Sequence, residues 1–145
     1  MTENMNDLIY AGNLSPEESW ELLCNDPGAE MIDVRTSAEF SYVGQPDLSA
    51  AGKELRLICW KIFPAMDINP NFETDVEALG ISRDRPLLFL CRSGVRSRSA
   101  AHAITARGYT RCYNVSEGFE GDKDDAKHRG TVNGWKVRGL PWTQG

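Results

Sequence analysis

The chain has 145 residues, with 16 Lys and Arg against 21 Asp and Glu and a formal charge of −5. This length suits one domain with a sizeable core, so residues 1–145 are expected to form a single domain whose core spans about residues 9–142. At 41% hydrophobic and 26% charged residues, the composition is that of a globular protein, which excludes a disordered chain.

Capped helices and short apolar strands alternate in the first half of the chain. Residues 15–18, SPEE, form a capping box with proline at the first helical position, and they predict a helix. Residues 30–34 predict a short buried strand. A second capping box at residues 36–39, TSAE, opens a helix that Gly44 ends. After a polar connection, the apolar residues 55–60 predict another strand.

The second half continues the alternation. A helix is predicted from Asn69-Pro70 to Gly80, and residues 86–90 form the most apolar strand. Residues 97–107 predict a helix, and residues 112–115 predict a further strand. This order predicts an open α/β fold in which helices cover both faces of a parallel sheet. Three apolar side chains are available to hold the polar tail from residue 118 on the body: Trp135, Leu140 and Trp142.

Positive charge is concentrated between residues 81 and 111. This segment holds seven arginines and one acid, Asp84, within an acidic chain. A compact positive segment favours a small anionic ligand held at one place, whereas a nucleic-acid surface shows a broader basic face. We therefore expect a small anionic partner and no nucleic acid. Arginines distributed around a solvated helix are the structural alternative.

The loop after residues 86–90 is the candidate site, because open parallel sheets bind ligands at the carboxyl ends of their strands. Gly94 allows a tight turn whose N–H groups converge, and the following helix adds the positive end of its dipole. Amides and arginines in this cradle favour a thiolate, so Cys91 is the expected catalytic nucleophile. The residues expected to bind the substrate follow it directly: Arg92, Ser93, Gly94, Val95, Arg96 and Ser97.

The other cysteines, Cys24, Cys59 and Cys112, lie in apolar contexts, and we expect them to be buried core thiols. No C-x-x-C pair is present, and neither histidine has a second ligand at metal spacing, so we expect no metal and no cofactor. The apolar runs are too short for a membrane-spanning helix, and the first residues lack a basic flank and a long apolar stretch. We therefore expect a cytoplasmic protein without membrane association; the sequence indicates no oligomeric state.

The loop CRSGVRS at residues 91–97 resembles the active-site loop of single-domain rhodaneses. MIDVR at residues 31–35, followed by Glu39-Phe40, is similar to their first-strand signature. Three shorter matches extend the resemblance to the end of the chain: Asn114-Val115, Gly118-Phe119 and GLPW at residues 139–142. The resemblance implies a rhodanese-like fold and thiosulfate-type sulfurtransferase activity, in which Cys91 carries a persulfide held by the loop amides.

Asp33 and Arg35 belong to this signature, and the resemblance places them near the active-site face in a supporting role. An Asp and an Arg at a strand end, with Glu39 in reach, favour a structural ion pair that fixes the following turn. The chain also departs from the family pattern, because Gly44-Gln45-Pro46-Asp47 lacks the usual histidine and the segment through Phe63-Pro64-Ala65 is longer. We expect a different pocket wall as a result.

Two other functions stay open beside a sulfurtransferase that uses thiosulfate or a similar donor. One is a sulfur-relay module that passes persulfide sulfur to a protein acceptor. The other is a cysteine-dependent phosphatase or arsenate reductase with the same fold. Those enzymes need a wider loop, with five residues between the cysteine and the arginine. Here four residues separate Cys91 from Arg96, which fits a single terminal sulfur better. Among the arginines, we expect Arg96 to bind the donor anion and Arg92 to point outward.

Overall fold

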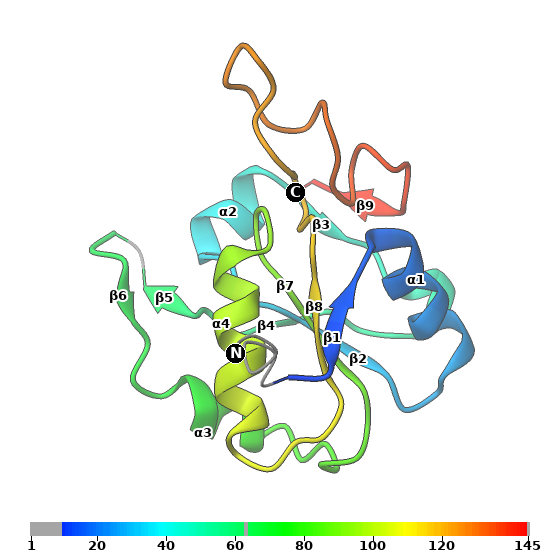
Figure 1. Ribbon diagram of the computed structural model, residues 1–145, viewed down its shortest axis with the longest axis vertical. Helices are drawn as coiled ribbons and strands as arrows, with labels where there is room; N and C mark the ends of the chain where they lie inside the picture. Colours follow the sequence, from blue (N-terminus) through cyan, green and yellow to red (C-terminus); the bar gives the residue numbers. More distant parts are fainter. Residues whose placement is uncertain (1–9, 63, 145) are drawn as a thin grey trace, which may run out of the picture.

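The centre of the molecule is a five-stranded parallel sheet with the strand order β1-β8-β7-β2-β4, shown in Figure 1. This computed structural model describes residues 10–62 and 64–144. The strands of the sheet are β1 (Gly12–Leu14), β2 (Glu30–Asp33), β4 (Arg56–Leu57), β7 (Leu87–Leu90) and β8 (Cys112–Val115). Two antiparallel pairs lie outside it: β3 (Gln45–Pro46) with β9 (Trp142–Thr143), and β5 (Lys61–Ile62) with β6 (Asp67–Ile68).

In the described residues, four α-helices and one short 3-10 helix, Ser49–Ala51, accompany the sheet. The α-helices are α1 (Pro16–Asn25), α2 (Ser37–Tyr42), α3 (Phe72–Glu77) and α4 (Val95–Thr105). Both predicted capping boxes are confirmed, since Ser15 and Glu18 cap α1 and Thr36 and Glu39 cap α2 reciprocally. α4 begins two residues earlier than predicted, because Gly94 at φ 103° completes the turn before Val95. No helix within residues 10–62 and 64–144 has the length and apolar character needed to cross a membrane.

The side chains of β7 alternate between two apolar cores, one on each face of the sheet. Leu87 and Phe89 belong to the core that includes buried residues of α3 and α4. Leu88 and Leu90 belong to the opposite core, which includes Leu23 of α1. The expected open α/β fold, a parallel sheet covered by helices on both faces, is therefore confirmed.

The structure differs from the prediction at two strands, because hydrogen-bond pairing with a neighbouring strand, and not the apolar sequence, determines where these strands form. The strand predicted at residues 55–60 is reduced to the two residues of β4. β1 was not predicted, because its three residues are too few and too polar to give an alternating pattern; it forms by pairing with β8. Residue 9, the expected start of the core, and Phe63 lie outside the described residues.

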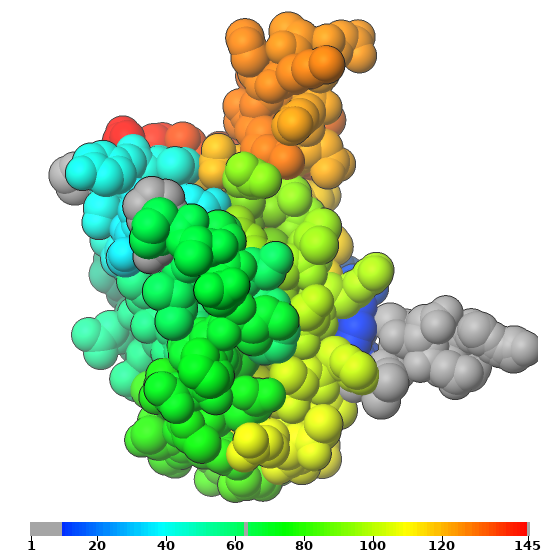
Figure 2. All heavy atoms as spheres, turned by 90° about the vertical axis from the view of Figure 1, so that its left-hand side faces the viewer, coloured from blue at the N-terminus to red at the C-terminus, as the bar shows by residue number. Residues whose placement is uncertain are grey.

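The tail after β8 packs back on the body, as predicted. Trp135 is fully buried, its indole N–H donates to the carbonyl of Pro141 at 2.7 Å, and its backbone N–H donates to the carbonyl of Gly118 at 2.9 Å. Leu140 is half-buried and Trp142 is in β9, which pairs with β3. Part of the tail, orange in Figure 2, projects from the body. Trp135 therefore anchors the segment that begins at Gly118.

Replacing Trp135 by Ala should lower the free energy of unfolding by about 3–5 kcal/mol, because it empties a buried site the size of an indole ring. Urea denaturation measures the change. Val137→Ala, at an exposed position two residues further on, should change stability by less than about 0.5 kcal/mol. Equal effects of the two substitutions would contradict an anchor at Trp135.

Candidate active site

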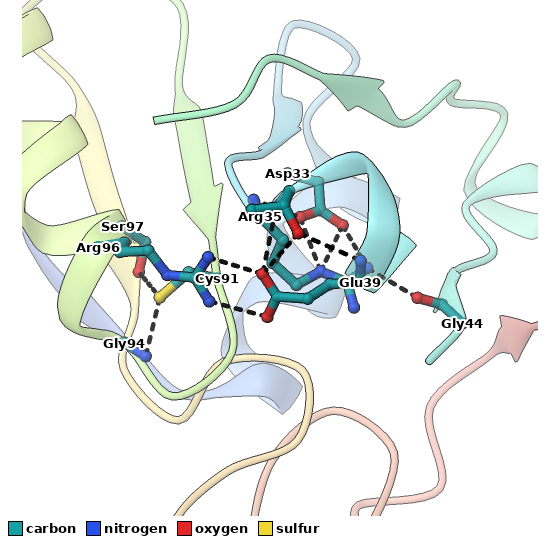
Figure 3. A network of polar contacts seen from close by, with 9 residues as sticks. Asp33, Arg35, Glu39, Gly44, Cys91, Gly94, Arg96 and Ser97 are labelled. Atoms are coloured by element: carbon teal, nitrogen blue, oxygen red, sulfur yellow. Dashed lines mark hydrogen bonds and ion pairs between the residues drawn. The ribbon is translucent and has the colours of Figure 1, made fainter. Parts of the chain in front are cut away.

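Cys91 directly follows β7, and Figure 1 shows α2 and the start of α4 at the end of the sheet where β7 ends. Its side chain is almost fully buried. The N–H of Gly94 donates to the Cys91 sulfur at 3.1 Å, and the Ser97 hydroxyl oxygen lies 3.2 Å from that sulfur (Figure 3). A β-carbon on Gly94 would stand 2.3 Å from the carbonyl oxygen of Ser116, so this turn requires glycine.

The backbone of the loop is held by the segment that follows β8. The N–H of Phe119 donates to the Cys91 carbonyl at 2.8 Å, and the N–H groups of Glu120 and Gly121 both donate to the Arg92 carbonyl at 3.0 Å. A β-carbon on Gly118 would lie 2.5 Å from that carbonyl, so the two backbones touch. In the sequence, Gly118-Phe119 stands out only as a match to the family. Its contact with the loop is made by backbone atoms, which leave no pattern of side chains in the sequence.

Glu39 links α2 to α4 across the site. Its two carboxylate oxygens accept hydrogen bonds from the two terminal nitrogens of Arg96 at 2.7 and 2.9 Å, as Figure 3 shows. One of them also accepts from the backbone and hydroxyl of Thr36. Burial raises the pKa of Glu39, but the bonds from Arg96 and Thr36 outweigh it and hold the pKa at about 2. The capping-box pattern indicates only the contact with Thr36.

Asp33 and Arg35 form a completely buried ion pair at the end of β2. The Arg35 guanidinium donates to both Asp33 oxygens at 2.6–3.1 Å, donates to the carbonyl of Gly44 at 2.8 Å, and lies 4.5 Å from the ring centre of Phe119. Burial raises the pKa of Asp33, and the Arg35 guanidinium opposes the rise. These contacts join β2, the end of α2 and the tail, which is the arrangement of a structural ion pair.

A cavity of about 670 Å³ opens beside the loop. Arg92 is exposed at its edge and forms no salt bridge with the residues in the described parts of the chain. The longer segment after α2 contributes Lys61 and Met66 to the wall. The other lining residues are Thr36, Ala38, Glu39, Val43, Cys91, Ser93, Val95, Arg96, Glu120 and Arg129.

None of the remaining three cysteines lines this cavity. The prediction that Cys24 is a core thiol is wrong, because it occupies the exposed side of α1. Cys59 is half-buried and Cys112 is buried, and burial raises the pKa of both thiols, that of Cys112 to about 11. Among the described residues, no three His, Cys, Asp or Glu side chains come together as a metal site would require.

A nearly buried cysteine at the end of a central parallel strand, enclosed by a tight turn and the start of a helix, defines an α/β protein with a cysteine-centred loop. Residues 15–125 match the family model described as a rhodanese-like domain, so the chain belongs to the rhodanese-like domain family.

Relatives extend this match over nearly the whole chain. The uncharacterized protein RP600 of Rickettsia prowazekii is 37% identical over 131 residues, covering 90% of this chain and 95% of the relative. The crystal structure of Rv0390 from M. tuberculosis is 43% identical with a TM-score of 0.85, covering 94% of this chain and 99% of that one. Thiosulfate sulfurtransferase GlpE of Actinobacillus pleuropneumoniae is 25% identical, covering 88% and 89% of the two chains. The family is thus of the sulfurtransferase type.

Replacing Glu39 by Gln should destabilise the fold at neutral pH by about 1.5–3 kcal/mol, because Arg96 loses an ionised acceptor. The pKa of Glu39 lies below its ordinary value of 4.5 in the folded protein, at about 2. Its ionised form therefore stabilises the fold above pH 4.5, and this contribution disappears as the pH falls toward 2. Urea denaturation should show that the gap between wild type and variant closes over this range.

Glu21→Gln, at an exposed position of α1, is the matched control, and it should leave stability nearly unchanged at every pH. A gap for Glu39→Gln that stays constant down to pH 2 would contradict the ion pair as the cause.

Proposed function

We propose that the protein is a sulfurtransferase that carries a sulfane sulfur as a persulfide on Cys91. The observation that carries the proposal is the position of the Cys91 sulfur, which accepts the N–H of Gly94 and lines a cavity edged by the exposed Arg92. The rhodanese-like family and the relative named thiosulfate sulfurtransferase support it. Thiosulfate or a similar anion is the proposed donor.

The reaction has two displacements. The Cys91 thiolate attacks the outer sulfur of thiosulfate, a new S–S bond forms, and sulfite leaves with the electron pair of the old S–S bond. An acceptor then attacks the outer sulfur of the persulfide and returns Cys91 as a thiolate. Gly94 is the N-cap residue of α4 and has no side chain that could accept a hydrogen bond. The N–H groups in the first turn of α4 are therefore not occupied by a capping side chain. These N–H groups and the dipole of α4 stabilise the anionic outer sulfur.

The ion pair with Glu39 changes the roles expected for the two arginines. Arg96 already has its charge compensated by a bidentate carboxylate, so it holds α4 against α2 and positions the loop. Arg92 is exposed on the cavity. We therefore assign to Arg92 the contact with the donor anion that the sequence alone assigned to Arg96.

Thiosulfate without an acceptor should add one sulfur atom to the wild-type protein and release one sulfite. Cyanide should then remove this sulfur as thiocyanate, and steady-state kinetics should be ping-pong. Intact-protein mass spectrometry before and after cyanide measures the adduct. Cys91→Ser should abolish the adduct and turnover, because it removes the attacking sulfur.

Cys24→Ser is the control for this experiment, since it removes an exposed thiol outside the cavity and should leave the adduct intact. A wild type that never gains sulfur from any sulfane donor, yet hydrolyses an aryl phosphate, would replace the proposal by the phosphatase alternative.

The cavity also favours a second candidate, a relay that hands its sulfur to a protein thiol. Its volume of about 670 Å³ far exceeds the space that thiosulfate fills, and apolar side chains stand exposed at its edge, Val95 at 73% and Met66 at 38%. Apolar groups at the mouth favour an acceptor with carbon substituents. In the mass experiment, persulfide that resists cyanide and small thiols would favour the relay.

Arg92→Ala should lower kcat/KM for thiosulfate about tenfold to a hundredfold, the effect of losing a hydrogen bond to a charged group, and leave thermal stability unchanged. Arg96→Ala should lower thermal stability as well, because Glu39 loses its partner. Arg98→Ala is the matched control, an exposed arginine of α4 outside the cavity lining. An Arg92 variant with the kinetics of the Arg98 variant would contradict the assignment.

A further inference from the structure

A chain of hydrogen bonds leads from the Cys91 sulfur through the sheet to β1. The Ser97 oxygen lies 3.2 Å from the sulfur, and the Ser97 hydroxyl donates to the side-chain oxygen of Asn114 at 2.5 Å. The side-chain nitrogen of Asn114 donates to the side-chain oxygen of Asn13 at 3.0 Å, and that oxygen also accepts from the Tyr10 hydroxyl at 3.0 Å. Only the first of these contacts lies within the loop of residues 91–97; the others lead from Ser97 to β8 and β1.

The hydrogen bonds of the structure give the chain a direction. Asn13 presents its side-chain oxygen, which accepts from Tyr10 and Asn114, so in this arrangement Asn114 has its nitrogen toward Asn13 and its oxygen toward Ser97. The single proton of the Ser97 hydroxyl is then committed to Asn114. Ser97 can therefore only accept from Cys91, which requires the protonated thiol as the donor.

Because these side chains are buried, reversing the direction of the hydrogen bonds costs free energy. Ser97 is fully buried and Asn114 is 3% exposed, so solvent does not supply replacement partners for these two side chains. If Cys91 ionises while the chain keeps its direction, the Ser97 oxygen loses its donor and faces a thiolate with its lone pairs. If instead the Ser97 hydroxyl turns to the sulfur, the buried oxygen of Asn114 loses its donor.

We propose that Asn114 is a positioning residue for the Cys91 nucleophile: it holds the Ser97 hydroxyl away from the sulfur and keeps resting Cys91 in its thiol form. Asn13 acts through Asn114 by fixing the orientation of its amide. On ionisation the proton leaves to solvent through the cavity, and the Ser97 hydroxyl turns to donate to the thiolate. The function of this control rests on the proposed role of Cys91, but the protonation of Cys91 is measurable without sulfur transfer.

Charged side chains also surround the site, and the variants used in the test leave them unchanged. The Asp33–Arg35 pair lies near Glu39 (Figure 3), and the Tyr10 phenol ends the chain of hydrogen bonds. The charged residues that line the cavity with Cys91 come from α2, β5, the loop with α4, and the segment after β8: Glu39, Lys61, Arg92, Arg96, Glu120 and Arg129. Substituting Asn114 by Leu or Asn13 by Ala changes none of these charges.

The test is the pH profile of Cys91 alkylation by iodoacetamide in the full chain, read by peptide mass mapping, with the exposed Cys24 as internal reference. Asn114→Leu frees the Ser97 hydroxyl for the thiolate, so the midpoint for Cys91 should fall by about one pH unit. Asn13→Ala should lower it in the same direction, because the amide of Asn114 can then turn its nitrogen to Ser97. Asn114→Asp retains an acceptor for Ser97 and should not lower the midpoint.

The decisive comparison is with Ser97→Ala, which removes the hydroxyl through which Asn114 acts. In that background, Asn114→Leu and Asn13→Ala should no longer move the midpoint. Unchanged midpoints in the single variants, or equal shifts without Ser97, would overturn the proposal. Asn13 is exposed, so its variant keeps the test available if Asn114→Leu does not fold. A failure of the proposed function would be distinguishable from this. The protein would then take up no sulfur, while the pH profiles of Cys91 alkylation would still show the expected shifts.

Discussion

Direct contact between two backbones organises the site. Neither Gly94 against Ser116 nor Gly118 against Arg92 has room for a side-chain carbon, and this closeness lets the carbonyls of Cys91 and Arg92 accept the N–H groups of the segment after β8. With those carbonyls occupied, the turn is fixed with the N–H of Gly94 on the sulfur. The anchor at Trp135 matters for the same reason, since it holds Gly118 in place from the far side.

Ion pairing explains why the positive segment of the sequence is not one positive site in space. Of its seven arginines, only Arg92 and Arg96 line the cavity. Four others form ion pairs with acids elsewhere on the surface: Arg83 and Arg107 with Glu77, Arg85 with Glu30, and Arg111 with Asp26. Such exposed pairs contribute little to stability, and their effect is to leave a small cationic region at the cavity.

Local signals predicted most of the fold, and long-range contacts account for what they missed. Capping boxes and apolar runs need only a few neighbouring residues, so α1, α2, β2, β7 and β8 were predicted correctly. The loop around Cys91 was also identified from adjacent residues. The bond from Arg96 to Glu39 joins positions 57 residues apart, and that from Asn114 to Asn13 joins positions 101 apart. Neither contact produces a pattern in neighbouring residues of the sequence, so neither could be predicted before the fold was known.

The deep turn and the wide cavity suit different steps of the proposed reaction. The Cys91 side chain is almost fully buried, and its sulfur lies 3.1 Å from the Gly94 nitrogen and 3.2 Å from the Ser97 oxygen. Once a sulfur is attached, the S–S bond of about 2.05 Å moves the reactive atom outward by that length. The acceptor then meets the outer sulfur in the open cavity and does not need to enter the turn. A narrow site for loading the sulfur can therefore serve an acceptor much larger than the donor, with Val95 and Met66 at the point of approach.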